Sequence, residues 1–186
     1  MRKQVILVTD GDSVAKKAII KACQKKKLYP ILESAGNPTP LTGAELVDEI
    51  EKAPFEPVVV MLDDRGKSGI GIGERAMEYL LQNDQLEILG VVAVASDTDA
   101  SRGVQVDKSV NNAGKITKGP VDKDGEPEPY GNRYLEGDTA ELLSHYPEVK
   151  IIGCGDLGKM GGRDNPGRGA KITTKCLEEV LKGTKH

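Results

Sequence analysis

Residues 5–12, VILVTDGD, join a run of apolar, mostly β-branched side chains to two aspartates, and the chain repeats this pattern twice. The other copies are VVVMLDD at residues 58–64 and VVAVASDTD at residues 91–99. β-Branched runs of this length are typical of strands that are buried on both faces of a parallel sheet. The pattern therefore predicts an α/β fold in which three strands each end in an acidic pair.

The acidic pairs form the first candidate site. Because the carboxyl ends of parallel strands line the ligand crevice of an open α/β sheet, we expect these carboxylates to approach one another. Such a cluster suits a cationic partner or a divalent cation, here Mg²⁺ or Ca²⁺. The alternative is that each aspartate only forms a turn or a helix cap after its strand. The candidate ligands are Asp10, Asp12, Asp63, Asp64 and Asp97.

Composition describes an ordinary globular protein. The 186 residues suit one α/β domain over 1–186 with a substantial core, and 38% of them are apolar and 30% charged. A net charge of −3 and the scarcity of aromatic residues argue against a nucleic-acid partner. A homo-oligomer is compatible with these features.

Cysteine usage and hydropathy bear on localisation. Cys23, Cys154 and Cys176 have no zinc-binding or redox spacing, which favours a reduced intracellular setting. The chain shows no signal peptide, and its longest apolar stretch, 89–95, is far shorter than the roughly 20 residues of a spanning helix. We therefore expect a soluble protein that reaches a membrane only through a partner.

Helical and strand-like segments alternate through the first half of the chain. The pattern predicts a three-layer, doubly wound parallel sheet of the Rossmann-like or flavodoxin-like class, with strand order 2-1-3-4-5. Strands are expected at 5–9, 28–34, 57–62 and 88–95, and helices at 13–27, 42–53 and 73–82.

The alternation stops after the fourth strand. Residues 104–110 and 115–117, joined by an Asn/Gly turn at 111–114, predict a β-hairpin within an insertion at about 101–135. A short helix at 138–145, a parallel strand at 149–152 and a closing helix at 172–181 are expected to follow.

Two glycine motifs were weighed as phosphate-binding sequences. Gly66-Lys67-Ser68 resembles the end of a P-loop, but Met61 stands where that motif requires its first glycine. The sequence GCGDLG at 153–158 matches a dinucleotide fingerprint, but the glycine-rich continuation at 159–169 cannot form the required helix. We therefore exclude NAD. The long loop itself is a functional candidate at the crevice edge, with Asp156, Lys159 and Arg163.

Two acidic-site classes fit the predicted strand ends. Asp10, Asp12 and Asp63, with Ser96 and Lys159, resemble the phospho-acceptor site of response-regulator receiver domains. The same acids resemble the metal-binding cluster of Toprim enzymes, although Asp10 stands where those enzymes carry glutamate.

The whole chain resembles a family more closely than either site does. The phrases that carry the resemblance are VILVTDGD at 5–12, SAGNP at 34–38, MLDD at 61–64, GVVAVAS at 90–96 and GDLGKMGGRD at 155–164. They are similar to stage V sporulation protein AE, the soluble AE protein of endospore-forming bacteria. The resemblance implies a role in sporulation or spore germination, peripheral to the spore inner membrane. The partners it implies are the membrane proteins of the channel that moves dipicolinic acid and calcium.

Two functions from different classes follow. The first is a non-enzymatic accessory protein that docks to those membrane partners through the crevice edge or the hairpin insertion, since no catalytic motif is complete. The second is a divalent-metal-dependent enzyme or sensor that binds phosphate or a nucleotide at the acidic strand ends.

Overall fold

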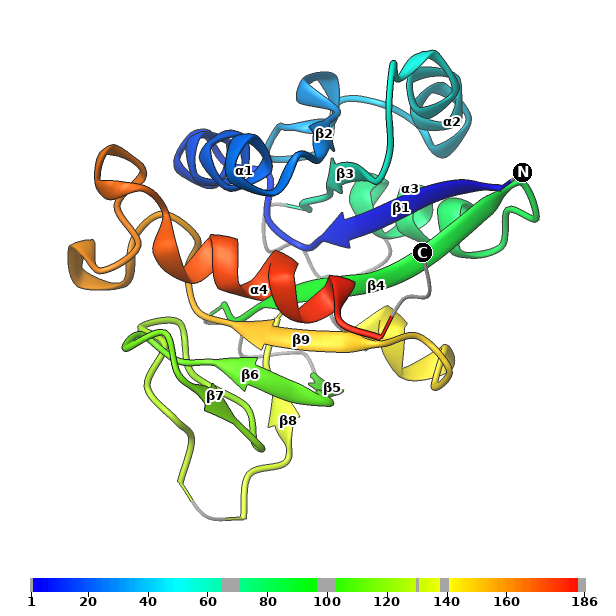
Figure 1. Cartoon of the computed structure of the whole chain (residues 1–186). Coiled ribbons are helices and arrows are strands. Elements are labelled where there is room, and N and C mark those ends of the chain that lie inside the picture. The colour runs from blue at the N-terminus through cyan, green and yellow to red at the C-terminus, as the bar shows by residue number, and fades with distance from the viewer. Residues whose placement is uncertain (1, 65–70, 97–102, 130, 138–140, 184–186) are drawn as a thin grey trace.

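The computed structural model describes residues 2–64, 71–96, 103–129, 131–137 and 141–183. Its centre is a seven-stranded sheet of order β2-β3-β1-β4-β9-β6-β7, in which every neighbouring pair except β6 and β7 is parallel (Figure 1). The main strands are β1 Lys3–Val8, β2 Tyr29–Pro30, β3 Val58–Met61, β4 Leu86–Val94, β6 Lys108–Val110, β7 Ile116–Thr117 and β9 Ile151–Cys154. A second, two-stranded sheet pairs β5 Val104–Gln105 with β8 Tyr134–Leu135.

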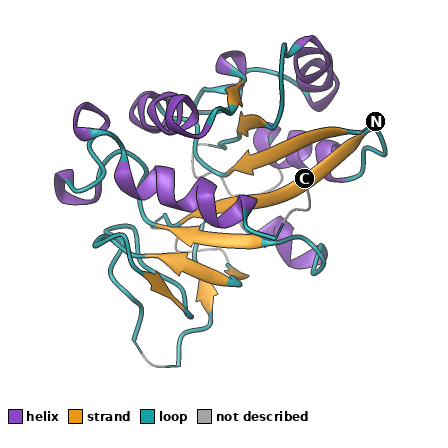
Figure 2. Cartoon of the chain, in the orientation of Figure 1, coloured by secondary structure: helices purple, strands orange, loops and turns teal. Residues whose placement is uncertain are grey.

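Helices cover both faces of the main sheet (Figure 2). The α-helices are α1 Ser13–Lys26, α2 Gly43–Lys52, α3 Ile72–Leu81 and α4 Lys171–Leu181. The 3₁₀ segments are η1 Leu32–Ser34, η2 Glu141–His145, η3 Met160–Gly162 and η4 Pro166–Arg168. Helices α1 and α4 pack on one face, and α2, α3 and η2 pack on the other. The predicted doubly wound α/β class is confirmed.

The strand β1 shows why an unbroken apolar run was needed. Its last four residues are all fully buried, but they alternate between the two faces of the sheet. Val5 and Leu7 belong to the core under α2 and α3, whereas Ile6 and Val8 belong to the core under α1 and α4. A polar residue at any of these positions would face a core, so the run has no alternation.

Two helix starts follow from capping chemistry. The Asp12 carboxylate accepts hydrogen bonds from the backbone N–H groups of Val14 at 2.7 Å and Ala15 at 2.8 Å, which starts α1. Thr42 and Glu45 form the predicted capping box of α2, in which each side chain accepts from the other's backbone N–H. Both helices therefore begin where the sequence placed them.

The second strand is much shorter than expected. Residues 28–34 were predicted as a strand, but β2 ends at Pro30 and the chain turns into η1. Pro30 has no N–H for the ladder, and the Ser34 hydroxyl donates to the Ile31 carbonyl at 2.6 Å and accepts from the Met61 N–H at 2.9 Å. These bonds satisfy the backbone locally, so the strand stops.

The strand order also differs from the flavodoxin-like order. The third strand, β3, lies between β2 and β1, whereas the expected order placed the first strand between the second and third. Residues of β3 are fully buried on both faces, while Tyr29 and Pro30 of β2 are half-buried. A short strand with proline suits the sheet edge, and a fully apolar strand suits the interior. β1 and β3 remain neighbours in either order.

The insertion contains the predicted hairpin but is not a separate appendage. β6 and β7 pair antiparallel around a turn in which Gly114 has φ 74° and Asn111 Oδ1 accepts from two turn N–H groups. β6 also pairs in parallel with β9, so the hairpin extends the main sheet. The expected strand 104–110 is instead split, and β5 pairs with β8. The short helix is a 3₁₀ segment, and its expected start at 138 lies outside the described residues.

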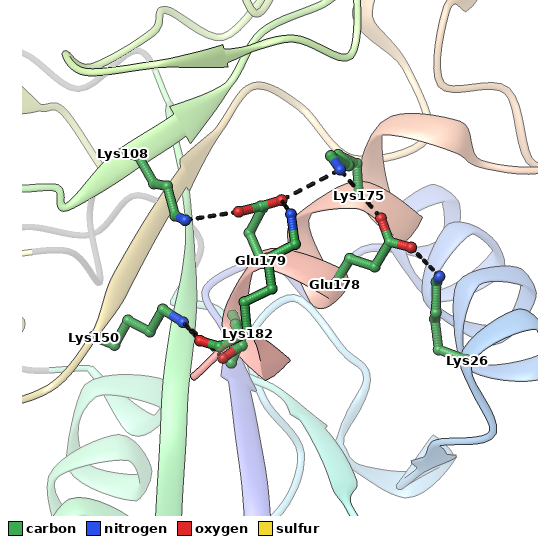
Figure 3. A network of polar contacts seen from close by, with 8 residues as sticks. Lys26, Lys108, Lys150, Lys175, Glu178, Glu179 and Lys182 are labelled. Atoms are coloured by element: carbon green, nitrogen blue, oxygen red, sulfur yellow. Dashed lines mark hydrogen bonds and ion pairs between the residues drawn. The ribbon is translucent and has the colours of Figure 1, made fainter. Parts of the chain in front are cut away.

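A lysine network fastens α4 to its neighbours (Figure 3). The Glu179 carboxylate is only 2% exposed and pairs with Lys108 Nζ of β6 at 2.7 Å, Lys175 Nζ at 3.3 Å and Lys182 Nζ. Burial by itself would raise the pKa of Glu179, but the hydrogen bonds from Lys108, Lys182 and Lys175 lower it to about 2. The inserted strand is thus tied to α4 through a buried charge.

Replacing this carboxylate has an effect that depends on pH. We expect Glu179→Gln to lower the free energy of unfolding by about 2 kcal/mol at neutral pH, because partly exposed lysines lose a buried partner. The native pKa lies below the ordinary 4.5, so the loss is present above that pH and disappears as the pH falls towards 2. Urea unfolding at neutral pH and near pH 2 measures this loss of stability, and the exposed Glu148→Gln variant is the control. Equal losses at the two pH values would contradict this account.

Candidate functional site

A pocket of about 210 Å³ lies at the carboxyl ends of the central strands. It is formed by the segments that follow β1, β3, β4 and β9, as expected for a parallel sheet. Its lining residues are Thr9, Asp10, Asp12, Asn37, Asp63, Val94, Ala95, Ser96, Asp156 and Lys159. The predicted convergence of Asp10, Asp12 and Asp63 with Ser96, Asp156 and Lys159 is therefore found.

Lys159 bridges two of the acids across the pocket. Its Nζ lies 2.7 Å from Asp12 Oδ2 and 3.4 Å from Asp156 Oδ2. Burial alone would raise the pKa of Asp12, but the hydrogen bonds from Lys159 and from the first turn of α1 hold that pKa below its usual value. Asp12 therefore serves as a helix cap and as an ion-pair partner at once.

Asp10 is the most perturbed acid of the pocket. The residue is 7% exposed, its Oδ1 accepts from the Asp12 N–H at 3.2 Å, and its buried Oδ2 has no hydrogen-bond partner within the described residues. Burial, followed by the negative charge of Asp12, raises the pKa of Asp10 from 3.8 to about 7. The side chain is thus a carboxyl group poised to change charge near neutral pH.

Asp63 is held beside Asp10 by backbone contacts. Its Oδ2 accepts from the Gly11 N–H at 3.2 Å, and its own N–H donates to the Thr39 hydroxyl at 2.8 Å. Gly11 has no room for a side chain, because a Cβ there would lie 2.5 Å from the Gly36 carbonyl oxygen and 3.2 Å from Asp63 Cβ. The glycine between Asp10 and Asp12 therefore lets the chain after β1 lie close to Gly36, in the loop after η1, and to Asp63.

Asp64 does not line the pocket, and its carboxylate instead binds backbone N–H groups of α3. Its Oδ1 accepts from the Gly73 N–H at 2.6 Å, and its Oδ2 accepts from the Glu74 N–H, also at 2.6 Å. The carboxylate thus caps the start of α3, and its negative charge interacts favourably with the helix dipole. For this residue the helix-cap alternative describes the geometry.

The other candidates separate in the structure. Ser96 lines the pocket and its N–H donates to the Glu136 carbonyl, whereas Arg163 is exposed and lies 3.7 Å from Glu126 Oε1, outside the pocket lining. Asp97 and Asp99, like the Gly66-Lys67-Ser68 motif, lie outside the described residues.

The glycine-rich loop after β9 is built around a carboxylate that sequence reasoning did not single out. Asp164 is fully buried, and its Oδ1 accepts from the N–H groups of Ile172 and Thr173 at 2.8 and 3.0 Å. Its Oδ2 accepts from the Gly158 N–H at 2.8 Å and the Thr173 hydroxyl at 2.5 Å. Asp164 closes the loop onto α4 and so positions Lys159. The feature of the sequence that could have indicated Asp164 is its position at the end of the phrase GDLGKMGGRD.

Sequence reasoning also missed the contribution of the turn before α2. Thr9 and Asn37 both line the pocket. Asn37 lies in the SAGNP phrase at 34–38, which was quoted only for the family resemblance, although a polar residue in a loop at this edge was a signal.

The described residues do not form a ready-made metal site with several acidic ligands. Within the ranges that the structure describes, no group of three or more His, Cys, Asp or Glu residues is arranged to hold a metal ion. The metal-binding hypothesis therefore stays a prediction.

The fold and the pocket define an α/β protein of the doubly wound class, with an acidic crevice at its central strands. The family model for stage V sporulation protein AE1 matches residues 4–184, and the chain belongs to this family. The resemblance drawn from the sequence is thereby confirmed, and membership gives the protein a sporulation-related role.

Other comparisons add little to this assignment. The comparison with curated proteins gives no match. Among solved structures, the chain is similar to the solution NMR structure of a de novo designed protein of the PLOOP2X3_50 fold, with 17% sequence identity and a TM-score of 0.45. The match covers 100% of this chain and 98% of the designed one. In the described part of the chain, none of the helices has the length and hydropathy needed to span a bilayer.

Proposed function

We propose that this protein is a non-enzymatic accessory protein of spore formation and germination that docks at the membrane. Its partners are the membrane proteins that move dipicolinic acid and calcium through the spore inner membrane. Membership of the sporulation family supports the cellular process. We assign the docking surface to α1, and not to the crevice edge or the hairpin insertion considered from the sequence, because of one observation, which is the distribution of charge on this helix.

The outer side of α1 carries positive charge only. Residues 13–27 include six lysines and no acidic residue, although the whole chain has a net charge of −3. Lys17, Lys21 and Lys25 recur at four-residue spacing and are exposed. We define the lysine face by its outward-directed members, which are Lys16, Lys17, Lys21, Lys25 and Lys27.

Neighbouring elements extend this surface. Arg168 of η4 and Lys171 of α4 are exposed beside α1, and the Lys25 ammonium donates to the Gly169 carbonyl. Lys26, which belongs to the same helix, pairs with Glu178 of α4 and is less exposed. The lysine face thus has the chemistry that an anionic bilayer surface recognises, at about 1 kcal/mol for each lysine near the lipid headgroups.

The test uses vesicles with and without anionic phospholipid. We expect the full chain to bind anionic vesicles and not neutral ones, and to be released by salt because screening weakens the attraction. Lys17→Gln with Lys21→Gln should weaken binding by at least about tenfold. The matched control changes two exposed lysines of the hairpin segment, Lys115→Gln with Lys118→Gln, and should bind as the wild type does.

Native membranes separate lipid attraction from protein docking. Membranes from sporulating cells should bind the chain more tightly than protein-free vesicles of the same lipids, and protease treatment of the membranes should remove the difference. Equal binding to both, or equal weakening by the hairpin control, would contradict the proposal.

One observation favours the second candidate function, a divalent-metal-dependent enzyme or sensor for phosphate or a nucleotide. The pocket places Asp10 Oδ2, which has no hydrogen-bond partner among the described residues, near Lys159, so acidic and basic groups lie in one cavity. Turnover of nucleotides or phosphoesters by a metal-loaded sample, lost in Asp10→Asn, would establish it in place of the accessory role.

A further inference from the structure

The lining of the 210 Å³ pocket has an excess of negative charge. Among its described residues are four aspartates, Asp10, Asp12, Asp63 and Asp156, and one lysine, Lys159. Lys159 lies against Asp12 and Asp156, at 2.7 and 3.4 Å. Its charge is therefore committed to one side of the pocket.

Asp10 provides an independent sign that the pocket takes a ligand. The side chain lines the pocket and is more than nine-tenths buried, yet its Oδ2 has no hydrogen-bond partner within the described residues. A buried polar atom without a partner costs about 1–3 kcal/mol. The unsatisfied oxygen at the end of a central strand is explained if a bound ion or a donor group of a ligand interacts with it.

We propose that this pocket binds a hydrated Mg²⁺ ion, with Asp10 as the direct carboxylate ligand and Asp63 as a contact to the bound water. Mg²⁺ commonly keeps several of its waters and is held by about one or two carboxylates. Ca²⁺ instead takes about six to eight oxygen ligands. Because Lys159 lies against Asp12 and Asp156, the pocket offers few carboxylates as direct ligands, and this favours Mg²⁺.

The pocket also has a suitable size. A volume of about 210 Å³ holds an ion with roughly five waters, at roughly 30 Å³ for each water, beside the direct Asp10 ligand. Thr9, Asn37 and Ser96 supply further polar groups along the lining for that water shell.

Calorimetric titration of the full chain with MgCl₂ tests this site. We expect saturable binding at millimolar Mg²⁺ or below, weaker binding of Ca²⁺, and a loss of at least about tenfold in Mg²⁺ affinity in Asp10→Asn. The matched control is Asp84→Asn, which removes an exposed carboxylate far from the pocket lining and should leave the affinity unchanged.

A second readout locates the ion. Mn²⁺, used as a paramagnetic substitute for Mg²⁺, should broaden the amide NMR signals of Gly11 and Ser96 in the wild type and leave them sharp in Asp10→Asn. Dispersed amide chemical shifts that match those of the wild type verify that the variant is folded. Absence of saturable Mg²⁺ binding, tighter Ca²⁺ binding, or broadening that persists in Asp10→Asn would overturn the proposal. Vesicle binding measured in EDTA is expected to be unaffected, so this site and membrane docking can fail separately.

Discussion

Replacing Asp164 with alanine is expected to lower the free energy of unfolding by about 4 kcal/mol. The carboxylate accepts four hydrogen bonds in a fully buried position, from three backbone N–H groups and the Thr173 hydroxyl. Alanine leaves these donors without an acceptor and also removes the cap of α4. Urea unfolding followed by circular dichroism measures the loss.

Two variants show whether this loss belongs to Asp164 itself. Asp164→Asn keeps an acceptor oxygen and should cost less than the alanine variant. Asp156→Ala, in the same loop, removes a partly exposed partner of Lys159 and should change stability by less than about 1 kcal/mol. A cost of less than about 1 kcal/mol for Asp164→Ala would show that the loop closes without it.

Asp10→Asn is expected to stabilise the protein at alkaline pH by about 4 kcal/mol. The native pKa of about 7 lies above the ordinary 3.8, so the folded protein binds the proton more tightly than the unfolded chain. Stability from this group is therefore fully present below about pH 4 and is lost as the pH rises through 7. Asparagine carries no charge at any pH, so the variant does not lose this stability as the pH rises.

The pH dependence distinguishes this effect from a general change in packing. The difference in unfolding free energy between Asp10→Asn and the wild type should grow from near zero at about pH 4 to its full value at about pH 8, in metal-free buffer. Asp84→Asn should show no such growth. A difference that is constant over this range would contradict the assigned burial of Asp10.

Much of the fold could be predicted because its signals are local. The apolar run in β1 marks a strand buried on both faces, and Asp12 and Thr42 mark the helix starts through their caps. The strand order could not be predicted in this way. The order depends on the shortening of β2 to two residues by Pro30 and by the hydrogen bonds of Ser34. One of these bonds is made with Met61 of β3, which lies 27 residues further along the chain.

The candidate site was predictable to the level of strand ends. Adjacency of β1 and β3 brings Asp10 and Asp63 together, and the loop after β9 brings Lys159 to Asp12. The separate roles of the acids could not be deduced, since Asp64 and Asp12 both follow strands. Only the positions of the α3 and α1 N–H groups show that Asp64 caps a helix away from the pocket lining, while Asp12 does so inside it.

The two ends of the main sheet limit how copies of this protein can associate. β2 and β7 are the edge strands, and each is only two residues long, with Pro30 interrupting the first. An edge of this length offers few unpaired N–H and C=O groups to a second chain. Continuous sheet formation between molecules through these two edges is therefore disfavoured, and an association of copies is expected to use side-chain contacts instead.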